Sequence, residues 1–215
     1  MAPVRRLILL RHGQTEWNAT DRMQGQLDTE LTDLGRAQAD DAARELSERK
    51  PLAVISSDLT RARDTADALA QLSGVPVAID PRLRETFLGD WQGLTHTEVD
   101  ERAPGARVAW RRDAMVAPPG GESRVDVAAR SKPVVEELIA SRSDWAEQPI
   151  VLVAHGGLIA ALTAALLDLP VDRWPVLGGL SNTSWVQLGA HGDRDRPNWT
   201  LDVWNASARV ASDVI

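Results

Sequence analysis

Two short apolar runs, each ending in a histidine followed by glycine, most constrain the fold of this chain. Leu-Ile-Leu-Leu at residues 7–10 leads into Arg11-His12-Gly13, and Ile-Val-Leu-Val-Ala at residues 150–154 leads into His155-Gly156-Gly157. Short apolar runs that stop at a turn signal are typical of strands buried in a parallel sheet. Such sheets bind ligands beyond the carboxyl ends of their strands. The two runs therefore predict two imidazoles at one edge of a sheet.

The remaining segments alternate between strand-like and helix-like patterns. Apolar residues recur at three-to-four spacing in the segments expected to be helical. Further strands are expected at residues 52–57, 75–80, 185–188 and 199–204. This alternation predicts an α/β protein, a three-layer α/β/α sandwich with a mostly parallel sheet, and one domain spanning residues 1–215.

Cap and turn signals indicate where the helices begin and end. Thr32 is a plausible N-cap of one helix, Ser57 or Asp58 would cap the next, and Gly74 would end it. Pro133 lies inside a later helical pattern and should kink it or mark a fresh start, because proline removes a backbone donor. These helices would cover the two faces of the sheet.

The region between residues 81 and 122 departs from this regular pattern and predicts loops with short helices. An excursion of this length in a compact domain is more often a functional lid than a linker. Trp110, Arg111 and Arg112 in this region would reach a carboxylate or a sugar if they faced a pocket. The simpler interpretation is a solvated helix face.

Composition excludes several classes of function. The 215 residues carry a net charge of −7 and include no cysteine. A general nucleic-acid surface is not expected, because it needs a basic face. The absence of cysteine excludes disulfides, thiolate metal sites and cysteine nucleophiles. The apolar runs are too short for a signal peptide or a membrane span, so we expect a cytoplasmic protein with no membrane partner.

The histidine pair is the strongest candidate for chemistry. Placed at one sheet edge, His12 and His155 would flank a small group from opposite sides, with Arg11 beside one of them. The glycines permit close backbone approach, and the helix after the second run would offer N–H groups to an anion. A single histidine at a strand end is more often structural than catalytic. For the pair, a structural and a catalytic role both remain open. His96 and His191 lie in polar contexts, and we expect both on the surface.

Motifs along the whole chain resemble, in content and order, those of the histidine phosphatase superfamily, which includes the cofactor-dependent phosphoglycerate mutases. The motifs are Arg11-His12-Gly13 with Thr15 and Asn18, Ser56-Ser57 with Arg61 and Thr65-Ala66, Arg84-Glu85 with residues 89–93, residues 120–123, and residues 154–157. This resemblance implies a phosphoglycerate mutase-like fold and a phosphomonoesterase that acts through a phosphohistidine intermediate.

The resemblance also implies roles for the strongest candidates. His12 would attack the phosphoryl group and carry it covalently. Arg11 and Arg61 would clamp the non-bridging oxygens, since guanidinium groups suit bidentate phosphate contacts. His155 would stabilise the charge of the transition state. No metal or other cofactor is expected, because the arginines supply the positive charge; without the resemblance, Arg61 would read as a solvated helix residue.

Four further residues complete the predicted site. Glu85 would be the general acid that protonates the leaving alkoxide and later the base for water. Asn18 and Gly156 would contact the phosphoryl group, and Gln24 would lie in a loop over it and orient the water. Without the resemblance, Glu85 would read as half of a surface ion pair with Arg84, and Asn18 as a turn residue.

The resemblance narrows the substrate to a small phosphate ester. The mutases carry extra segments that enclose a phosphorylated intermediate, whereas residues 91–120 are compact here and favour hydrolysis. Three segments are similar to those of actinobacterial phosphatases in this superfamily that convert glucosyl-3-phosphoglycerate to glucosylglycerate, a precursor of methylglucose lipopolysaccharide: residues 22–31, 88–96 and 201–210.

Several alternatives remain open from the sequence. They are a broad-specificity or alpha-ribazole phosphatase, a phosphoglycerate mutase, and a non-catalytic phospho-ligand binder. Phe87 and Trp17 depart from the family pattern and are expected near the pocket mouth, where they would affect substrate preference rather than catalysis. Relatives are often dimers, so a homodimer is possible.

Overall fold

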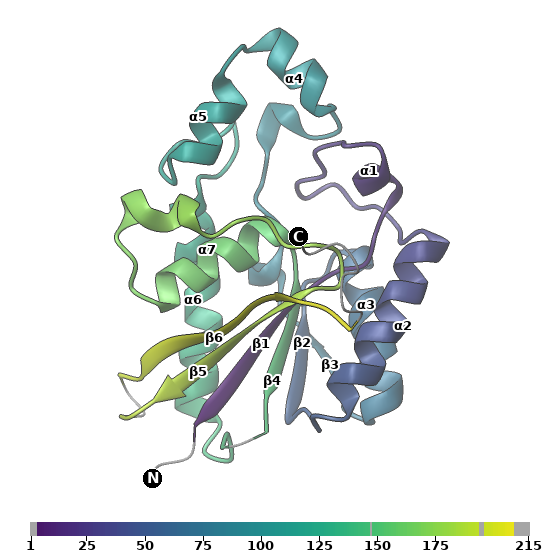
Figure 1. Ribbon diagram of the computed structural model, residues 1–215, viewed down its shortest axis with the longest axis vertical. Coiled ribbons are helices and arrows are strands. Elements are labelled where there is room, and N and C mark those ends of the chain that lie inside the picture. The colour runs from purple at the N-terminus through teal and green to yellow at the C-terminus, as the bar shows by residue number, and fades with distance from the viewer. Residues whose placement is uncertain (1–3, 147, 194–195, 209–215) are drawn as a thin grey trace, which may run out of the picture.

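The centre of the protein is a single six-stranded sheet. The computed structural model describes residues 4–146, 148–193 and 196–208. Within them the strand order is β3-β2-β4-β1-β5-β6. The strands are β1 (Arg5–Arg11), β2 (Ala53–Ser56), β3 (Val77–Ile79), β4 (Ile150–Ala154), β5 (Trp185–His191) and β6 (Asn198–Ala206). Helices cover both faces of this sheet (Figure 1).

The sheet is mostly parallel. β1 pairs with β4, β4 with β2 and β2 with β3, all in parallel. β5 is antiparallel both to β1 and to β6, so it alone among these six strands runs against the others. The predicted α/β/α sandwich with a mostly parallel sheet is confirmed.

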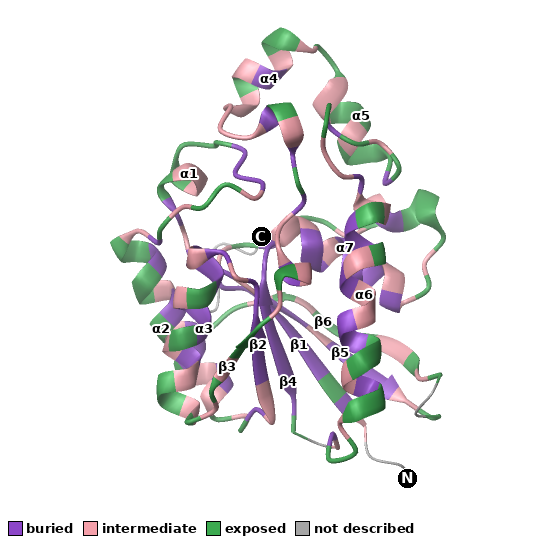
Figure 2. Cartoon of the chain, turned by 180° about the vertical axis from the view of Figure 1, so that it is seen from behind, coloured by how far each residue is buried: buried purple, intermediate pink, exposed green. Residues whose placement is uncertain are grey.

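The central strands β1 and β4 are buried on both faces of the sheet, as their unbroken apolar runs predict. Leu7 and Leu9 of β1 pack into a core shared with α6 (Arg124–Ser141) and α7 (Gly156–Leu166). Ile8 and Leu10 point to the opposite face, into a core shared with α2 (Asp33–Ser47) and α3 (Thr60–Ser73). Figure 2 shows β1, β2 and β4 buried along most of their length, whereas the edge strands β3 and β6 are half-buried or exposed. The two cores fix β1 and β4 rigidly between the helical layers.

Two of the predicted helix ends are confirmed. The Thr32 side chain caps α2 by accepting a hydrogen bond from the Gly35 N–H at 3.0 Å. Gly74 ends α3 in the left-handed conformation, with φ of 73°. Pro133 lies inside α6, which continues through it, so the alternative of a fresh helix at this proline is wrong.

The predicted cap of α3 is wrong, because both candidate side chains have other partners. Leu59 occupies the N-cap position and gives no side-chain cap. The hydroxyl of Ser57 lies 3.0 Å from Nε2 of His155. The carboxylate of Asp58 accepts two hydrogen bonds from the guanidinium of Arg84. The side chains before α3 thus serve the edge of the sheet rather than the helix.

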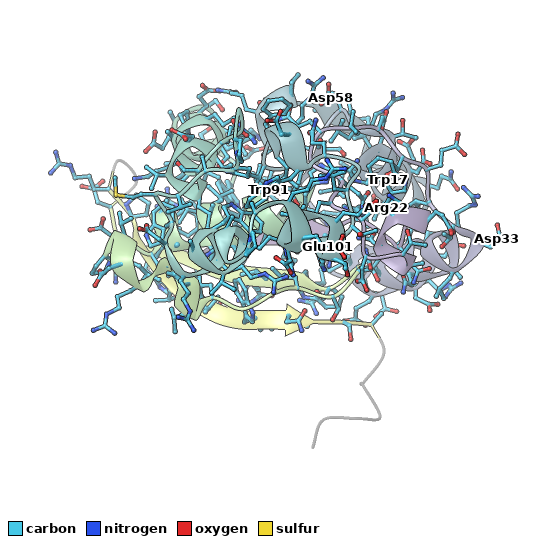
Figure 3. The ribbon with its side chains drawn as sticks, turned by 90° about the horizontal axis from the view of Figure 1, so that it is seen from above. Trp17, Arg22, Asp33, Asp58, Trp91 and Glu101 are labelled. Carbon is cyan, nitrogen blue, oxygen red and sulfur yellow. The ribbon has the colours of Figure 1, made fainter. Side chains whose placement is uncertain are left out.

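The loose region after β3 forms short helices above the carboxyl edge of the sheet (Figure 1). They are α4 (His96–Arg102) and α5 (Ala106–Arg112), preceded by the 3-10 turns η1 (Pro81–Leu83) and η2 (Gly89–Trp91). Met23, Leu88, Trp91 and Val99 form a small apolar cluster here. Seen from above, Trp91 lies towards the middle of the molecule and Asp33 at its rim (Figure 3).

Two short elements lie outside the main layers. α1 (Glu16–Ala19) follows the loop after β1, and the 3-10 helix η3 (Val171–Val176) follows α7. Among the described residues, every helix is too short or too polar to cross a lipid bilayer.

We expect Gly35→Ala to destabilise the fold, although alanine is the better helix former. A methyl group at Gly35 would lie 2.0 Å from the carbonyl oxygen of Gln14, which belongs to the loop after β1. Helix propensity favours alanine by about 0.5–1 kcal/mol, whereas overpacking against backbone costs about 1–3 kcal/mol. Urea unfolding should therefore show a lower free energy of unfolding for Gly35→Ala. Gly178→Ala is the control, because nothing lies within 4 Å of its added methyl group. A stabilised Gly35→Ala protein would contradict this packing.

Candidate active site

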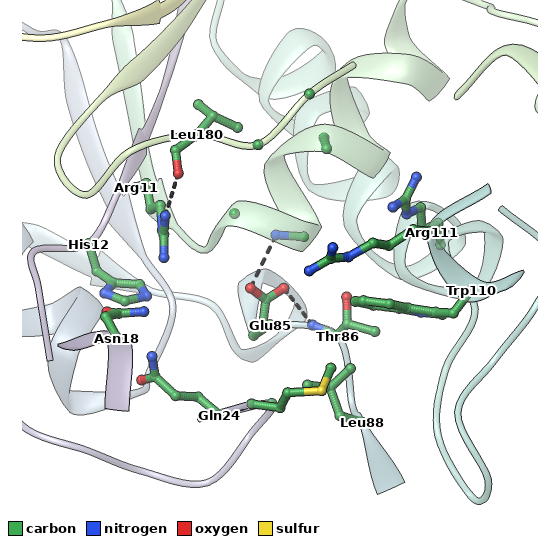
Figure 4. A pocket seen from close by; sticks show the side chains of 18 of the residues that line it. Arg11, His12, Asn18, Gln24, Glu85, Thr86, Leu88, Trp110, Arg111 and Leu180 are labelled. Atoms are coloured by element: carbon green, nitrogen blue, oxygen red, sulfur yellow. Dashed lines mark hydrogen bonds between the residues drawn. The ribbon is translucent and has the colours of Figure 1, made fainter. Parts of the chain in front are cut away.

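A cleft of about 610 Å³ lies where β1 and β4 end, below the short helices (Figure 4). Its lining includes seven of the predicted site residues: Arg11, His12, Asn18, Gln24, Arg61, Glu85 and Gly156. His155 does not line the cleft but is fully buried beside His12. The structure thus brings together residues that are spread over most of the chain.

The register of the sheet explains why the two histidines meet. Arg11 of β1 pairs with Ala154 of β4, so the next residue of each parallel strand is a histidine at the same level. The His12 backbone N–H donates to the Ala154 carbonyl at 3.1 Å. The two imidazole centroids are 5.1 Å apart, with 58° between the ring planes.

The His12 imidazole is held as a neutral ring with a free Nε2. Its Nδ1 lies 2.7 Å from the carbonyl oxygen of Gly13. Because a carbonyl can only accept, Nδ1 carries the ring proton and Nε2 keeps its lone pair. Burial, with Arg61 and Arg11 nearby, holds the pKa of His12 well below the usual 6.5. This ring is unprotonated at neutral pH and can act as a nucleophile.

His155 has one ring nitrogen engaged and one without a partner. Its Nε2 lies 3.0 Å from the Ser57 hydroxyl. Its Nδ1 is buried and makes no hydrogen bond within the described part of the chain. Burial above all, with Arg61 next, holds the pKa of His155 well below 6.5. A buried polar atom without a partner indicates a site that a ligand would complete.

A buried arginine, Arg61, and a half-buried one, Arg11, face this histidine pair, and among the described residues no carboxylate is hydrogen-bonded to either. Arg61 on α3 is fully buried and donates to the carbonyls of Leu27 at 2.9 Å and Gly25 at 2.8 Å. Burial lowers its pKa to about 10. Arg11 donates to the carbonyl of Leu180, and burial lowers its pKa too. The charge of Glu85 acts on both guanidiniums, but two positive charges that lose hydration near a single carboxyl group remain costly, so this end of the cleft is prepared for an anion.

The amide side chains of Asn18 and Gln24 are oriented by hydrogen bonds to their oxygens. Oδ1 of Asn18 accepts from the Thr15 N–H at 3.1 Å and from the Asn182 amide at 3.2 Å. Oε1 of Gln24 accepts from the Thr29 hydroxyl at 2.8 Å. Their NH₂ groups are left to donate into the cleft, where Figure 4 shows both amides close to His12. Asn18 thus lies in the short helix α1, where it forms the capping box with Thr15, rather than in a turn, and it is also part of the cleft wall.

Glu85 occupies the N-terminus of α7. Its carboxylate accepts hydrogen bonds from the N–H groups of Thr86 at 2.8 Å, Gly157 at 3.1 Å and Leu158 at 3.0 Å. The prediction that the N–H groups after the second run bind an external anion is wrong for Gly157 and Leu158, because both donate to the carboxyl oxygens of Glu85. The pairing of Glu85 with Arg84 is not formed either, since Arg84 binds Asp58.

Several residues that were expected at the surface or at the pocket mouth lie elsewhere. His96, Trp110 and Arg111 line the cleft, whereas Arg112 does not, although both arginines are exposed to solvent. His191 is half-buried in β5, with Nε2 3.1 Å from the Thr200 hydroxyl. Phe87 and Trp17, which were expected at the pocket mouth, are not part of the cleft lining.

Comparison with known proteins supports the reading of this geometry. The family model of the histidine phosphatase superfamily (branch 1) matches residues 7–207. The chain belongs to this superfamily.

Similar histidine phosphatases are known from mycobacteria. A Mycolicibacterium vanbaalenii protein named glucosyl-3-phosphoglycerate phosphatase is 65% identical over 223 residues, covering 99% of both chains. A Mycobacterium tuberculosis protein of the same name is 61% identical over 220 residues, covering 98% of this chain and 99% of that one. The solved structure of the mycobacterial enzyme with VO3 superposes with a TM-score of 0.93 at 62% identity, covering 94% of this chain and 100% of that one.

The structure of this histidine phosphatase also shows supporting residues that the sequence did not reveal. Arg130 on α6 donates to the carbonyl of Glu85 at 2.8 Å and pairs with Glu122 at 2.8 Å. Glu122 in turn accepts from the Phe87 N–H at 2.8 Å. Glu122 belongs to the Gly-Gly-Glu-Ser motif, whereas nothing in the sequence marked Arg130. Together they fix the backbone that carries Glu85.

We expect the stability of this histidine phosphatase to fall as the pH drops below 6.5. His12 and His155 are neutral in the fold but bind protons near pH 6.5 once unfolded. The unfolded chain then holds more protons, so acid favours it, by at most about 1.4 kcal/mol per pH unit for each histidine. This stabilisation is complete above pH 6.5.

Urea unfolding between pH 5 and 7.5 measures this dependence. A protein with both His12→Asn and His155→Asn should show a shallower loss of unfolding free energy below pH 6.5. The same slope in the variant and the wild type would contradict the depressed pKa of the two rings.

Proposed function

We propose that this histidine phosphatase hydrolyses glucosyl-3-phosphoglycerate to glucosylglycerate and phosphate through a phosphohistidine at His12. The observation that carries the catalytic part is the buried, neutral His12 ring, whose Nε2 is free beside Arg11 and Arg61. Support for the substrate comes from the relatives of that name, which are 61–65% identical over nearly the whole chain.

In the first step, Nε2 of His12 forms a bond to phosphorus as the bond from phosphorus to the ester oxygen breaks. Arg11 and Arg61 would hold the non-bridging oxygens and offset their charge. His155 and the amide of Asn18 would donate to the same oxygens. The leaving oxygen takes its proton from Glu85 and departs as the alcohol.

In the second step, water attacks phosphorus on the opposite side from the His12 nitrogen. The Glu85 carboxylate takes a proton from this water, and the amide of Gln24 would orient it. Gly156 would leave room for the phosphoryl group beside Arg11, because it has no side chain to fill the space. Phosphate leaves, and His12 returns to its neutral form with Nδ1 still bonded to Gly13.

A catalytic role fits the cleft better than a role as a phospho-ligand binder, because nucleophile, acid and second histidine are all present. Residues 81–122 would act as a lid, since α4 and α5 lie above the cleft. A homodimer remains a proposal as well. Hydrolysis of many unrelated esters, of alpha-ribazole phosphate, or isomerisation of 3-phosphoglycerate would support the corresponding alternative.

A panel of phosphate esters tests the proposed substrate. Phosphate release should be fastest for glucosyl-3-phosphoglycerate, and equal rates across unrelated esters would reject this specificity. His12→Ala should abolish turnover with every ester while the thermal midpoint and circular dichroism stay near those of the wild type. Rapid acid-free quenching should trap labelled phosphate on the wild type only. An active His12→Ala protein would overturn the mechanism.

Glu85→Gln should slow the reaction in a way that depends on the leaving group. A positioned acid contributes about 10²–10⁴-fold when the leaving alkoxide needs a proton. We therefore expect a large loss of kcat for a sugar or glycerate ester. The loss should be much smaller for phosphoryl transfer from p-nitrophenyl phosphate, whose leaving group departs unaided, as measured in the pre-steady-state burst. Equal losses for both esters would argue against Glu85 as the acid.

A further inference from the structure

Ser57 lies at the same edge of the sheet as the two histidines, although it does not line the cleft. It directly follows β2, as His155 directly follows β4, and these two strands pair in parallel. The Ser57 backbone N–H donates to the carbonyl of Val153 in β4 at 3.0 Å. Ser57 and His155 are both fully buried. The serine hydroxyl therefore meets the imidazole out of contact with solvent.

The hydroxyl of Ser57 has one neighbour that can only donate and one that can accept. Its Oγ accepts a hydrogen bond from the Leu59 backbone N–H at 3.3 Å. The same Oγ lies 3.0 Å from Nε2 of His155. Within the described residues the hydroxyl has no other hydrogen-bond partner. Because an N–H cannot accept, Nε2 is the group that can take the hydroxyl proton.

The ring of His155 is neutral, so it carries one proton on one of its two nitrogens. If Nε2 carried the proton, the Ser57 hydroxyl proton and the Nδ1 lone pair would both be buried without a partner. If Nδ1 carries the proton, the hydroxyl donates to Nε2, and only the Nδ1–H lacks a partner within the described part of the chain. Unmade hydrogen bonds of buried groups are costly, so the second arrangement is favoured.

The two histidines of the pair then share a tautomer but present opposite groups. In His12 the carbonyl of Gly13 accepts from Nδ1, which leaves the lone pair of Nε2 free. In His155 the hydroxyl of Ser57 occupies Nε2, which leaves an N–H free at Nδ1. The ring centroids are 5.1 Å apart. A nucleophilic nitrogen and a hydrogen-bond donor thus lie side by side.

We propose that Ser57 is a positioning residue, which holds His155 in the tautomer with the proton on Nδ1, so that this N–H donates to a phosphoryl oxygen. This inference rests on the proposed function, in which the phosphoryl group is transferred to His12 beside this ring. With the other tautomer, Nδ1 would present a lone pair to the phosphoryl oxygens and repel them. Ser57 therefore determines whether the second histidine attracts or repels the developing charge.

NMR of the free protein, labelled with ¹⁵N at histidine, tests the tautomer directly. Couplings to the ring C–H protons distinguish Nδ1 from Nε2, and the signals of His155 are identified by their absence in His155→Asn. At neutral pH the wild type should show a protonated Nδ1 and an unprotonated Nε2 for His155. Ser57→Ala should show a population of this ring with the proton on Nε2, because the hydroxyl no longer occupies that nitrogen.

Ser56→Ala is the matched control. Ser56 is the preceding residue and is equally buried, but its hydroxyl donates to the Ser57 carbonyl at 2.8 Å and not to the ring. Its spectrum for His155 should match the wild type. A wild-type ring with its proton on Nε2, or an unchanged ring in Ser57→Ala, would overturn the inference.

Pre-steady-state bursts with p-nitrophenyl phosphate test whether Ser57 acts through His155. Ser57→Ala should slow the burst about three- to tenfold, the usual net effect of one hydrogen bond, with little change in KM. In a His155→Ala background, the same serine substitution should cause no further loss, because the ring through which it acts is gone. An equal loss in both backgrounds would indicate a purely structural serine and overturn the inference, as would an unchanged burst in Ser57→Ala. The wild-type spectra decide the tautomer whether or not His155→Ala folds.

These measurements do not involve the alcohol part of the proposed substrate, so they separate the inference from the proposed function. If the protein failed to hydrolyse glucosyl-3-phosphoglycerate but gave the expected spectra and bursts, the role of Ser57 would stand and the proposed substrate would fall. If that ester were hydrolysed while His155 carried its proton on Nε2, the role of Ser57 would fall and the proposed function would stand.

Discussion

The parallel pairing of β1 with β4 is the constraint on which the rest of the site depends. It brings the residues after Arg11 and Ala154 to one level, and both are histidines. The same pairing places the first turn of α7 beside them, and that turn binds Glu85 through its backbone N–H groups. A slip of one residue between the strands would separate the two rings and move the helix end. Since both faces of the sheet are packed with apolar side chains, such a slip would also expose the core.

The positive charges at the end of the cleft lower the stability of the protein in favour of its function. Arg61 is buried and Arg11 is half-buried, no carboxylate among the described residues is hydrogen-bonded to either, and burial also holds the rings of His12 and His155 neutral. These groups destabilise the empty protein, because desolvated charges lose their hydration without regaining it elsewhere. An anion that binds between these charges would offset the lost hydration energy. On the proposed mechanism, these charges favour binding of the phosphoryl group before any contact with the alcohol part of the substrate.

Sequence patterns predicted the elements that follow simple periodicity, and they failed where long-range contacts decide. The β1 and β4 runs, the Thr32 cap and the Gly74 helix end all follow from local rules. The predicted cap at Ser57 or Asp58 is wrong because both side chains bind residues that are distant in the sequence. Ser57 contacts His155, and Asp58 pairs with Arg84. No local rule reveals such partners.

The same limit applies within the candidate site. The family motifs predicted which residues would gather, and the structure places seven of them on the cleft wall. The facing of α5 could not be predicted, because a short helix is oriented by its packing. Here Trp110 meets Trp91 edge to face, with centroids 5.9 Å apart, and with the helix in this orientation Arg111, although exposed, lines the cleft while Arg112 does not.

The contact of Arg61 with the loop around Gln24 limits how the substrate preference of this protein can change. Arg61 reaches out of α3 to hold the carbonyls of Gly25 and Leu27, so one guanidinium ties the loop that carries Gln24 to the anion end of the cleft. A change in that loop's path would disturb phosphate binding itself. The helices α4 and α5 have no comparable tie to Arg61. Substitutions in α4 and α5 can therefore change the substrate preference with little effect on the phosphoryl end of the cleft. Substitutions in the loop around Gln24 would affect the phosphoryl end, which every substrate shares.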